Sequence, residues 1–354
     1  MASSAPDSPI PSSRARVLWQ LAFDMDVRTP PLALADGLVL SLDRGRRSEL
    51  RRLALDDGTT RWTRELPHRA HGGPVRTGGA LAVPLVNGQV QALRLDDGAL
   101  WGPAWTLPGP PNPTLGAAGG HFFARCGQGV DAALHALAPG RPAPLWSVPD
   151  PLAGADTARL RVTDGVLVLA GALPEADTVV IAGVDPATGR LLWSHREATS
   201  RLLDLWAVAG LVDVVTSSGV LGLVAGTGEL RSARFGGFPL ESACAVGEHL
   251  IAMMEGHMGP VLLCFHLVSQ RLVGRVSRAM TRLVGAHANE VLVTLINGDP
   301  VFYTLPSLDQ IDFPEIEALS DPKLTVWSRD VCYVLGADER TLTAVDLDPP
   351  RRVA

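Results

Sequence analysis

Several residue types and patterns that carry familiar chemistry are scarce in this sequence. It has only four cysteines, Cys126, Cys244, Cys264 and Cys332, each inside an apolar run and none in a CxxC pair. This spacing argues against a zinc site or a redox motif, and it predicts buried free thiols, as in a reducing compartment. No apolar run approaches the roughly 18 residues that a membrane span needs.

The N-terminal segment and the charge argue against further classes. Residues 1–15 are polar and lack the apolar core of a secretory signal, so we expect a disordered tail on a cytoplasmic protein. Lys323 is the only lysine, and the formal net charge is −6. General binders of nucleic acids and of anionic membranes need excess positive charge, so the composition argues against both.

Familiar catalytic motifs are missing as well. The sequence contains no GxSxG elbow, HExxH pair, Walker loop or dinucleotide fingerprint. No set of nucleophile, base and acid stands out among its residues. We therefore expect a protein that is not an enzyme and that binds no metal.

The sequence does contain an internal repeat. Residues 184–193, VDPATGRLLW, form a turn signal in which Asp-Pro begins the turn and Gly189 allows a positive φ. Related turns recur along the chain, and their glycines or equivalent residues are spaced by 40, 42, 49, 39, 42 and 39 residues. The turns lie at residues 53–62, 93–101, 134–146, 184–193, 223–235, 265–276 and 303–313.

A second series of turns has the same period, beginning with ADGLVLSL at 35–42. Each unit therefore holds four short strands, and no unit has the helical periodicity of a helical solenoid. Four antiparallel strands at a period near 40 are typical of a propeller blade. We predict an all-β fold with a single β-propeller. In the first unit the strands are expected at about 32–35, 38–42, 50–55 and 60–66.

The two ends of the chain are expected to complete one blade together. The last unit ends after its third strand at 341–348, whereas 16–24 looks like an isolated fourth strand that carries Trp19. Pairing them closes the ring, removes an unpaired edge and gives eight blades. Seven blades are the alternative, if 243–277 or 282–313 is not a true blade. The expected blades are 32–66, 75–107, 115–148, 160–196, 202–235, 243–277, 282–313, and 324–348 with 16–23.

The units at 53–62, 93–101 and 184–193 resemble the pyrroloquinoline-quinone (PQQ)-type propeller repeat, in which a strand ending in ALD precedes a tGxxxW turn. The resemblance covers residues 16–350 and is strongest in the first four units. This superfamily includes eight-bladed quinoprotein dehydrogenases, an outer-membrane assembly lipoprotein and many propellers without catalysis. The resemblance implies that the tryptophans pack between blades, with Phe235 as a substitute in the fifth unit. They are Trp19, Trp62, Trp101 (or Trp105), Trp146 and Trp193.

The resemblance does not imply a quinone cofactor in this chain. Dehydrogenases with this repeat carry a disulfide between adjacent cysteines and a calcium or lanthanide ion held by Glu, Asn and Asp. This sequence has no adjacent cysteines, and it lacks the lipidated cysteine of the assembly lipoprotein. We therefore expect a non-catalytic member with no cofactor.

Two segments rich in arginine and histidine are the candidate partner-binding loops. Residues 43–52 hold five arginines around a hairpin, and 66–76 connect the first blade to the second. By propeller topology both lie on one face, and guanidinium groups suit carboxylates and phosphates. The candidate contacts are Arg44, Arg46, Arg47, His68, Arg69 and His71.

Alternatives stay open at these two segments. Both can be ordinary solvated loops without a ligand. His68 and His71 have the i, i+3 spacing of two metal ligands, although no third ligand is visible. A local contact with RNA or phosphate at Arg44–Arg52 is also left open.

Two more loops could make protein contacts. The first is methionine-rich, at 253–260, where we expect Met253 and Met254 to pack in the core and His257 and Met258 to form a mobile tip. The second is the acidic loop at 313–323, which could meet a basic partner.

The sequence therefore predicts a scaffold for protein–protein interaction, within a bacterial multi-protein complex in the cytoplasm. A rigid ring can present loops without moving, and aromatic or arginine anchors carry most of the energy at such surfaces. An enzyme or a small-ligand sensor that uses the central channel is the alternative. The innermost strands, however, carry few of the carboxylates that catalysis there would need.

Overall fold

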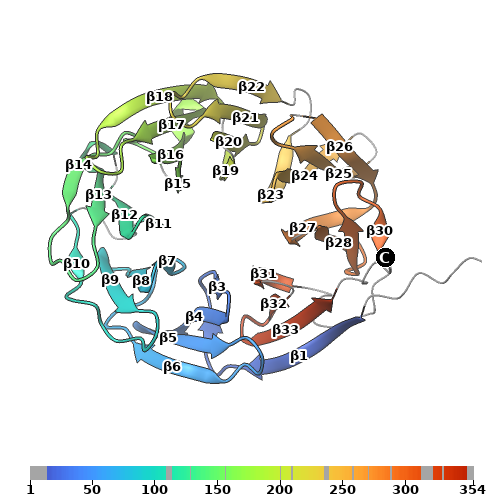
Figure 1. Cartoon of the computed structure of the whole chain (residues 1–354). Helices are drawn as coiled ribbons and strands as arrows, with labels where there is room; N and C mark the ends of the chain where they lie inside the picture. Colours follow the sequence, from blue (N-terminus) through green and yellow to red (C-terminus); the bar gives the residue numbers. More distant parts are fainter. Residues whose placement is uncertain are drawn as a thin grey trace, which may run out of the picture.

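The structure is a computed structural model, in which the chain forms a closed ring of eight sheets around a central axis (Figure 1). No α-helix occurs in the described residues, only the 3₁₀ helices η1 (Gly129–Asp131) and η2 (Pro174–Ala176). The predicted all-β propeller with eight blades is thus confirmed. The structure describes residues 14–108, 114–127, 129–155, 157–199, 201–208, 210–234, 239–256, 259–269, 271–287, 289–311, 322–328 and 331–348.

Each blade has four antiparallel strands that follow one another from the axis outward, and the sheet of blade 1 includes a fifth, short strand. Blade 1 contains β3 (Leu32–Leu34), β4 (Gly37–Arg44), β5 (Arg47–Ala54) and β6 (Thr60–Glu65). Blade 2 contains β7 (Val75–Thr77), β8 (Ala80–Pro84), β9 (Gln89–Arg94) and β10 (Trp105–Thr106). Blade 3 contains β11 (Thr114–Ala118), β12 (His121–Cys126), β13 (Ala133–Leu137) and β14 (Trp146–Pro149). Blade 4 contains β15 (Thr157–Thr163), β16 (Val166–Leu173), β17 (Thr178–Val184) and β18 (Leu191–Ala198).

The second half of the ring repeats this order. Blade 5 contains β19 (Leu202–Val208), β20 (Leu211–Thr216), β21 (Gly219–Val224) and β22 (Leu230–Arg234). Blade 6 contains β23 (Leu240–Val246), β24 (His249–Gly256), β25 (Gly259–His266) and β26 (Arg271–Ser277). Blade 7 contains β27 (Met280–His287), β28 (Glu290–Leu295), β29 (Pro300–Thr304) and β30 (Gln310–Ile311). Blade 8 contains β31 (Pro322–Ser328), β32 (Val331–Gly336), β33 (Thr341–Asp348) and β1 (Arg14–Ala22).

The N-terminal strand closes the ring, as predicted. β1 pairs antiparallel with β33, from Arg14 opposite Asp348 to Ala22 opposite Thr341. The strand begins two residues earlier than expected, so Arg14 and Ala15 belong to blade 8 and not to the tail. Residues 1–13 lie outside the described residues. One element was not predicted: β2 (Asp26–Val27) adds a short fifth strand to blade 1 by pairing with β4.

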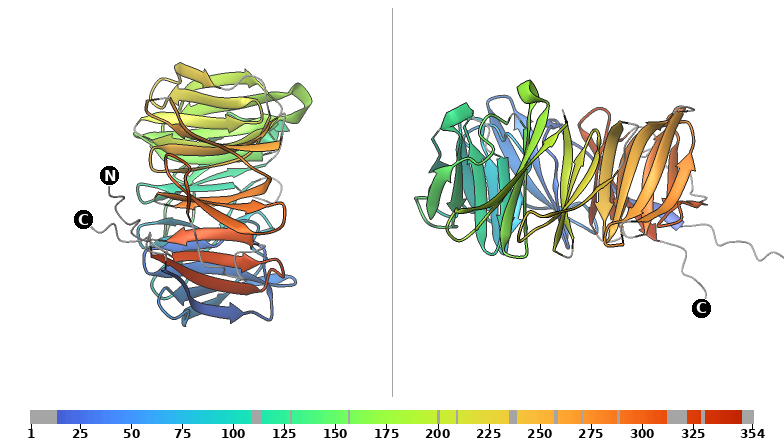
Figure 2. Two further views of the ribbon diagram at one scale, coloured as in Figure 1. Left: turned by 90° about the vertical axis from the view of Figure 1, so that its right-hand side faces the viewer. Right: turned by 90° about the horizontal axis from the view of Figure 1, so that it is seen from above.

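The strands run between the two faces of the ring, which Figure 2 shows edge-on. One face carries the connections from one blade to the next and those between the second and third strands of each blade. The hairpin at 44–47, the connection at 66–74 and both 3₁₀ helices belong to this face. We call it the loop face.

The apolar core lies between neighbouring blades, and tryptophans join the blades at its outer edge. The indole Nε1–H of Trp19, on the last blade, donates to the carbonyl of Leu55 on the first, at 2.8 Å. Trp62 makes the same bond to Leu95 of blade 2 at 2.8 Å. Such a bond satisfies the polar end of a ring whose remainder is packed. The predicted packing between neighbouring blades is confirmed for Trp19, Trp62, Trp146 and Trp193.

The turn glycine of the following blade makes this close contact feasible. Gly98 has φ of +66°, and a Cβ on it would come within 2.7 Å of the Trp62 ring. The position thus needs both the positive φ and the absence of a side chain.

Both candidate tryptophans of blade 2 contact blade 3. Trp101 lies against the turn glycine of blade 3, as Trp62 lies against that of blade 2: a Cβ on Gly140 would come within 3.3 Å of the Trp101 indole nitrogen. Trp101 is nevertheless 37% exposed, whereas Trp105 is 1% exposed and donates to the carbonyl of Arg141 of blade 3 at 2.7 Å. Trp105 is therefore the buried core residue of the two, and Trp101 is a partly exposed contact at the turn.

The sulfur-bearing side chains are mostly structural. All four cysteines are free thiols, and Cys126, Cys264 and Cys332 are buried, as expected. Burial raises the pKa of Cys126 and of Cys244 to about 12 and that of Cys264 to about 11. Met253 is buried and Met254 packs against the core, as predicted. His257, Met258, Phe235 and residues 313–321 of the acidic loop lie outside the described residues.

Candidate interaction surfaces

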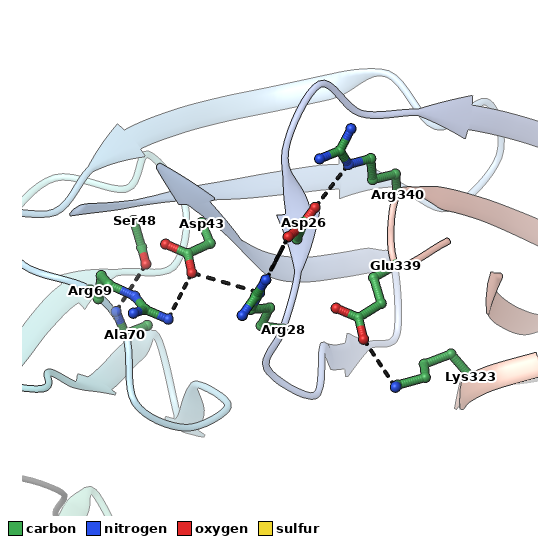
Figure 3. A network of polar contacts seen from close by, with 9 residues as sticks. All are labelled: Asp26, Arg28, Asp43, Ser48, Arg69, Ala70, Lys323, Glu339 and Arg340. Carbon is green, nitrogen blue, oxygen red and sulfur yellow. Dashed lines mark hydrogen bonds and ion pairs between the residues drawn. The ribbon is translucent and has the colours of Figure 1, made fainter. Parts of the chain in front are cut away.

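The fold brings the two predicted loops together on the loop face (Figure 3). The Ser48 hydroxyl accepts a hydrogen bond from the backbone N–H of Ala70 at 2.9 Å, and the Ser48 carbonyl accepts one from Leu66 at 2.8 Å. Arg69 forms an ion pair with Asp43 across the gap, at 2.8 Å. The hairpin of blade 1 and the connection to blade 2 therefore form one braced surface.

Most arginines of this surface are neutralised within the chain. Arg44 pairs with Glu49 at 3.1 Å, and its Nε also contacts the sulfur of Met25 at 3.0 Å. Arg47 pairs with Glu65 at 3.0 Å. With Arg69 held by Asp43, the surface is less basic than the sequence suggests.

Arg46 is the exception among the predicted arginines. It is exposed at the tip of the hairpin and has neither an ion pair nor a side-chain hydrogen bond within the described residues. His68 and His71 are also exposed, and partial burial lowers the pKa of His71, which favours its neutral form. Together these three side chains are the part of the predicted site that remains available to a partner.

His68 and His71 were left open as two possible metal ligands, and no third ligand joins them within the described residues. Within the described ranges, no group of three His, Cys, Asp or Glu side chains is placed to hold a metal ion. The pair His68 and His71 therefore stays a pair on an exposed loop.

The contacts on the loop face continue across the seam where the ring closes, because Arg28 lies 3.9 Å from the Asp43 carboxylate (Figure 3). Asp26 accepts hydrogen bonds from Arg340 of blade 8 at 2.8 Å and from Arg28 at 2.9 Å. These two bonds hold the pKa of the Asp26 carboxyl below its ordinary value. Beside them, Lys323 pairs with Glu339 at 3.0 Å.

Because the pKa of Asp26 is lowered in the folded state, the direction in which its contribution to stability changes with pH is known. A carboxyl whose pKa is lower in the folded state adds stability above its unfolded pKa, and that stability is lost as the pH falls through the folded pKa. We expect Asp26→Asn to lower the thermal midpoint at pH 6, and the deficit relative to wild type to shrink below about pH 4. Scanning calorimetry from pH 6 to pH 3 measures it, with exposed Asp24→Asn as control. A deficit that stays constant down to pH 3 would contradict the assignment.

The innermost strands have the opposite charge balance from the chain as a whole. These are β3, β7, β11, β15, β19, β23, β27 and β31, which surround the axis in Figure 1. They carry two acidic side chains, Asp204 and Glu241, in agreement with the expected scarcity of carboxylates. They also carry five basic ones, a bias that was not predicted from the sequence: Arg76, Arg159, Arg161, Arg282 and Lys323.

Comparison with known proteins agrees with the repeat. Residues 11–105 match the sequence profile of a family described as "Outer membrane protein assembly factor BamB". In this range lie the first two repeat turns and the Trp19 and Trp62 contacts between blades. Within residues 11–105 the chain is therefore similar in sequence to the PQQ-like β-propeller repeat superfamily. No curated protein sequence matches it significantly.

Solved structures of this superfamily and of other propellers share the fold. BamB from Moraxella catarrhalis is 14% identical, with a TM-score of 0.65 over 94% of this chain and 98% of that one. The quinohemoprotein alcohol dehydrogenase ADHIIG from Pseudomonas putida HK5 is 12% identical, with a TM-score of 0.63 over 96% and 77%. Saccharomyces cerevisiae Sqt1 is 12% identical, with a TM-score of 0.62 over 94% and 98%. At such identities the likeness establishes the fold alone.

Among the described residues, no helix has the length and apolar character to cross a membrane.

Proposed function

We propose that this propeller is a non-enzymatic scaffold that binds a partner protein through the loop face of blades 1 and 2, as a subunit of a cytoplasmic bacterial complex. The observation that carries the proposal is Arg46, an exposed arginine without a partner within the described residues, on a hairpin that its neighbours brace. The similarity to BamB, described as an assembly factor, supports a role in building a complex.

Contacts within the chain hold the loops of this surface in place, and this favours binding. The hydrogen bonds at Ser48 and the ion pair of Arg69 with Asp43 hold the backbone beside Arg46 before any partner arrives. Binding then needs little ordering of the loops, which lowers its entropic cost. A planar guanidinium on such a frame suits a carboxylate of the partner, and the exposed His68 and His71 lie on the connection that Ser48 braces against the same hairpin.

The ion pairs of this surface also decide which substitution tests it. Reversing Arg44 or Arg47 would leave Glu49 or Glu65 beside a like charge, so a loss of binding could reflect local distortion. Arg46→Glu changes only the group that faces solvent. Arg231, exposed on the outer strand β22 of blade 5, offers a matched control.

Photo-cross-linking in the native host is the test. With p-benzoyl-phenylalanine in place of His68, we expect one discrete cross-linked protein. Arg46→Glu in the same chain should lower the yield at least about fivefold, since an arginine anchor at an interface centre carries much of the energy. Arg231→Glu should leave the yield unchanged. No adduct from position 68, or equal yields in both reversal variants, would reject this docking surface.

A further inference from the structure

The wall of the axis at blades 4 and 5 holds a cluster of charged and aromatic side chains. Arg159 and Arg161 stand two residues apart on β15, so they project from the same side of that strand. Asp204 and Trp206 stand two residues apart on the neighbouring innermost strand, β19. The guanidinium of Arg161 lies 5.8 Å from the centre of the Trp206 ring, and Arg159 lies 3.8 Å from the Asp204 carboxylate.

The two arginines differ in their direct contacts. Arg159 forms an ion pair with Asp204. Arg161 forms no ion pair within the described residues: its one hydrogen bond goes to the carbonyl of Leu160, at 3.1 Å, and the Asp204 carboxylate acts on it only through space. Its side chain is exposed. Arg161 is therefore a cation beside the axis without a direct counter-ion, and an aromatic ring lies against its face.

Other side chains add to the positive potential. Arg76 of blade 2 and Arg282 of blade 7 also bond only to backbone carbonyls within the described part of the chain. When the strands around an axis carry mainly one sign of charge, ions of the opposite sign become concentrated near that axis. The chain as a whole is acidic, at −6, so this local excess does not follow from composition.

We propose that the axis wall of blades 4 and 5 binds the carboxylate or phosphate group of a small anionic ligand, with Arg161 as the principal contact. The guanidinium fork matches such groups with two parallel hydrogen bonds. The indole Nε1–H of Trp206 is buried and has no hydrogen-bond partner among the described residues, so a ligand that reached it would satisfy this donor. The Asp204 carboxylate repels an anionic ligand and so lowers the affinity of the site for it. This site stands apart from partner docking at Arg46, and either can fail without the other.

The experiment uses citrate and inorganic phosphate as separate probes, titrated at constant ionic strength with chloride as the balancing anion. Fluorine NMR of the full chain labelled with 5-fluorotryptophan reports on Trp206, whose resonance is assigned with Trp206→Phe. We expect a saturable shift with at least one probe, and the tighter of the two identifies the ligand as a carboxylate or a phosphate. Constant ionic strength separates binding from general screening.

Charge variants at Arg161 and Asp204 should change the affinity for the anion in opposite directions. Arg161→Gln should weaken the binding about tenfold and Arg161→Lys less, because lysine keeps the charge without the fork. Asp204→Asn, which keeps an acceptor for the N–H of Leu205, should tighten it. Arg231→Gln on the outer strand is the matched control, with no change expected. A Trp206 resonance that does not shift up to about 10 mM of either probe, or equal affinities in wild type and Arg161→Gln, would overturn the proposal.

Discussion

Replacing Asp150 with alanine is expected to destabilise the ring by about 3–5 kcal/mol, because it leaves the buried charge of Arg125 without a counter-charge. The Asp150 side chain is fully buried and pairs with Arg125 at 2.7 Å. Arg125 also donates to the carbonyl of Ala155 at 2.9 Å, and Asp150 accepts from the N–H of Leu152 at 3.0 Å. The pair thus fixes the connection from blade 3 to blade 4, and alanine would leave the guanidinium without a counter-charge.

Urea denaturation measures the free energy of unfolding. Glu65→Ala is the matched control, because it removes an ion pair whose two side chains are both more than half exposed. Such a pair contributes about 1 kcal/mol or less. If Asp150→Ala lowers stability no more than Glu65→Ala does, the buried pair does not hold the connection. Asp150→Asn, which keeps an acceptor for Leu152, should fall between the two.

The second large effect is expected at blade 2, where two tryptophans stand four residues apart. Trp105→Ala should cost about 3–5 kcal/mol, because the ring is almost fully buried between blades and its N–H loses the Arg141 carbonyl. Trp101→Ala should cost about 1 kcal/mol or less, since that ring is 37% exposed. Urea denaturation of both variants checks the difference, and equal losses, or a larger loss for Trp101→Ala, would contradict the assignment.

This contrast shows where the repeat pattern stops being informative. The period near 40 and the paired turn signals were enough to predict the strand order within each blade, because it follows from local turn chemistry. The missing fourth strand of the last unit and the isolated strand at 16–24 then predicted the closure by β1 and favoured eight blades over seven. These features were not enough to choose between Trp101 and Trp105. The burial of Trp105 depends on how the segment between the two tryptophans, which contains Gly102 with φ of +92°, leads into β10, and the spacing of the other units does not reveal this.

The candidate surface was also predictable only in part. Propeller topology placed the arginine hairpin beside the loop of His68 and His71, and the structure has them joined through Ser48. The neutralisation of Arg47 by Glu65 and of Arg69 by Asp43 was not visible in the sequence. Those partners are 18 and 26 residues away along the chain, and only strand register and loop packing bring them together.

The charged and aromatic cluster at the axis, formed by Arg159, Arg161, Asp204 and Trp206, was not among the predicted sites, although part of it can be seen in the sequence. The alternation TARLRVT in 157–163 puts two arginines on one side of an innermost strand, which the strand period of two predicts. Their relation to Asp204 and Trp206, more than 40 residues on, depends on the contact between blades 4 and 5. The repeat identifies the innermost strands, but side-chain pairs across blades require the structure.

Partner binding through Arg46, on the braced loop face of blades 1 and 2, is the step on which the proposed function depends. The yield of one cross-linked protein from position 68 measures it in three chains: wild type at position 46, Arg46→Glu and Arg231→Glu. We predict a discrete adduct that Arg46→Glu diminishes and Arg231→Glu leaves intact. An adduct equally strong in all three chains, or no adduct at all, would contradict the proposed function.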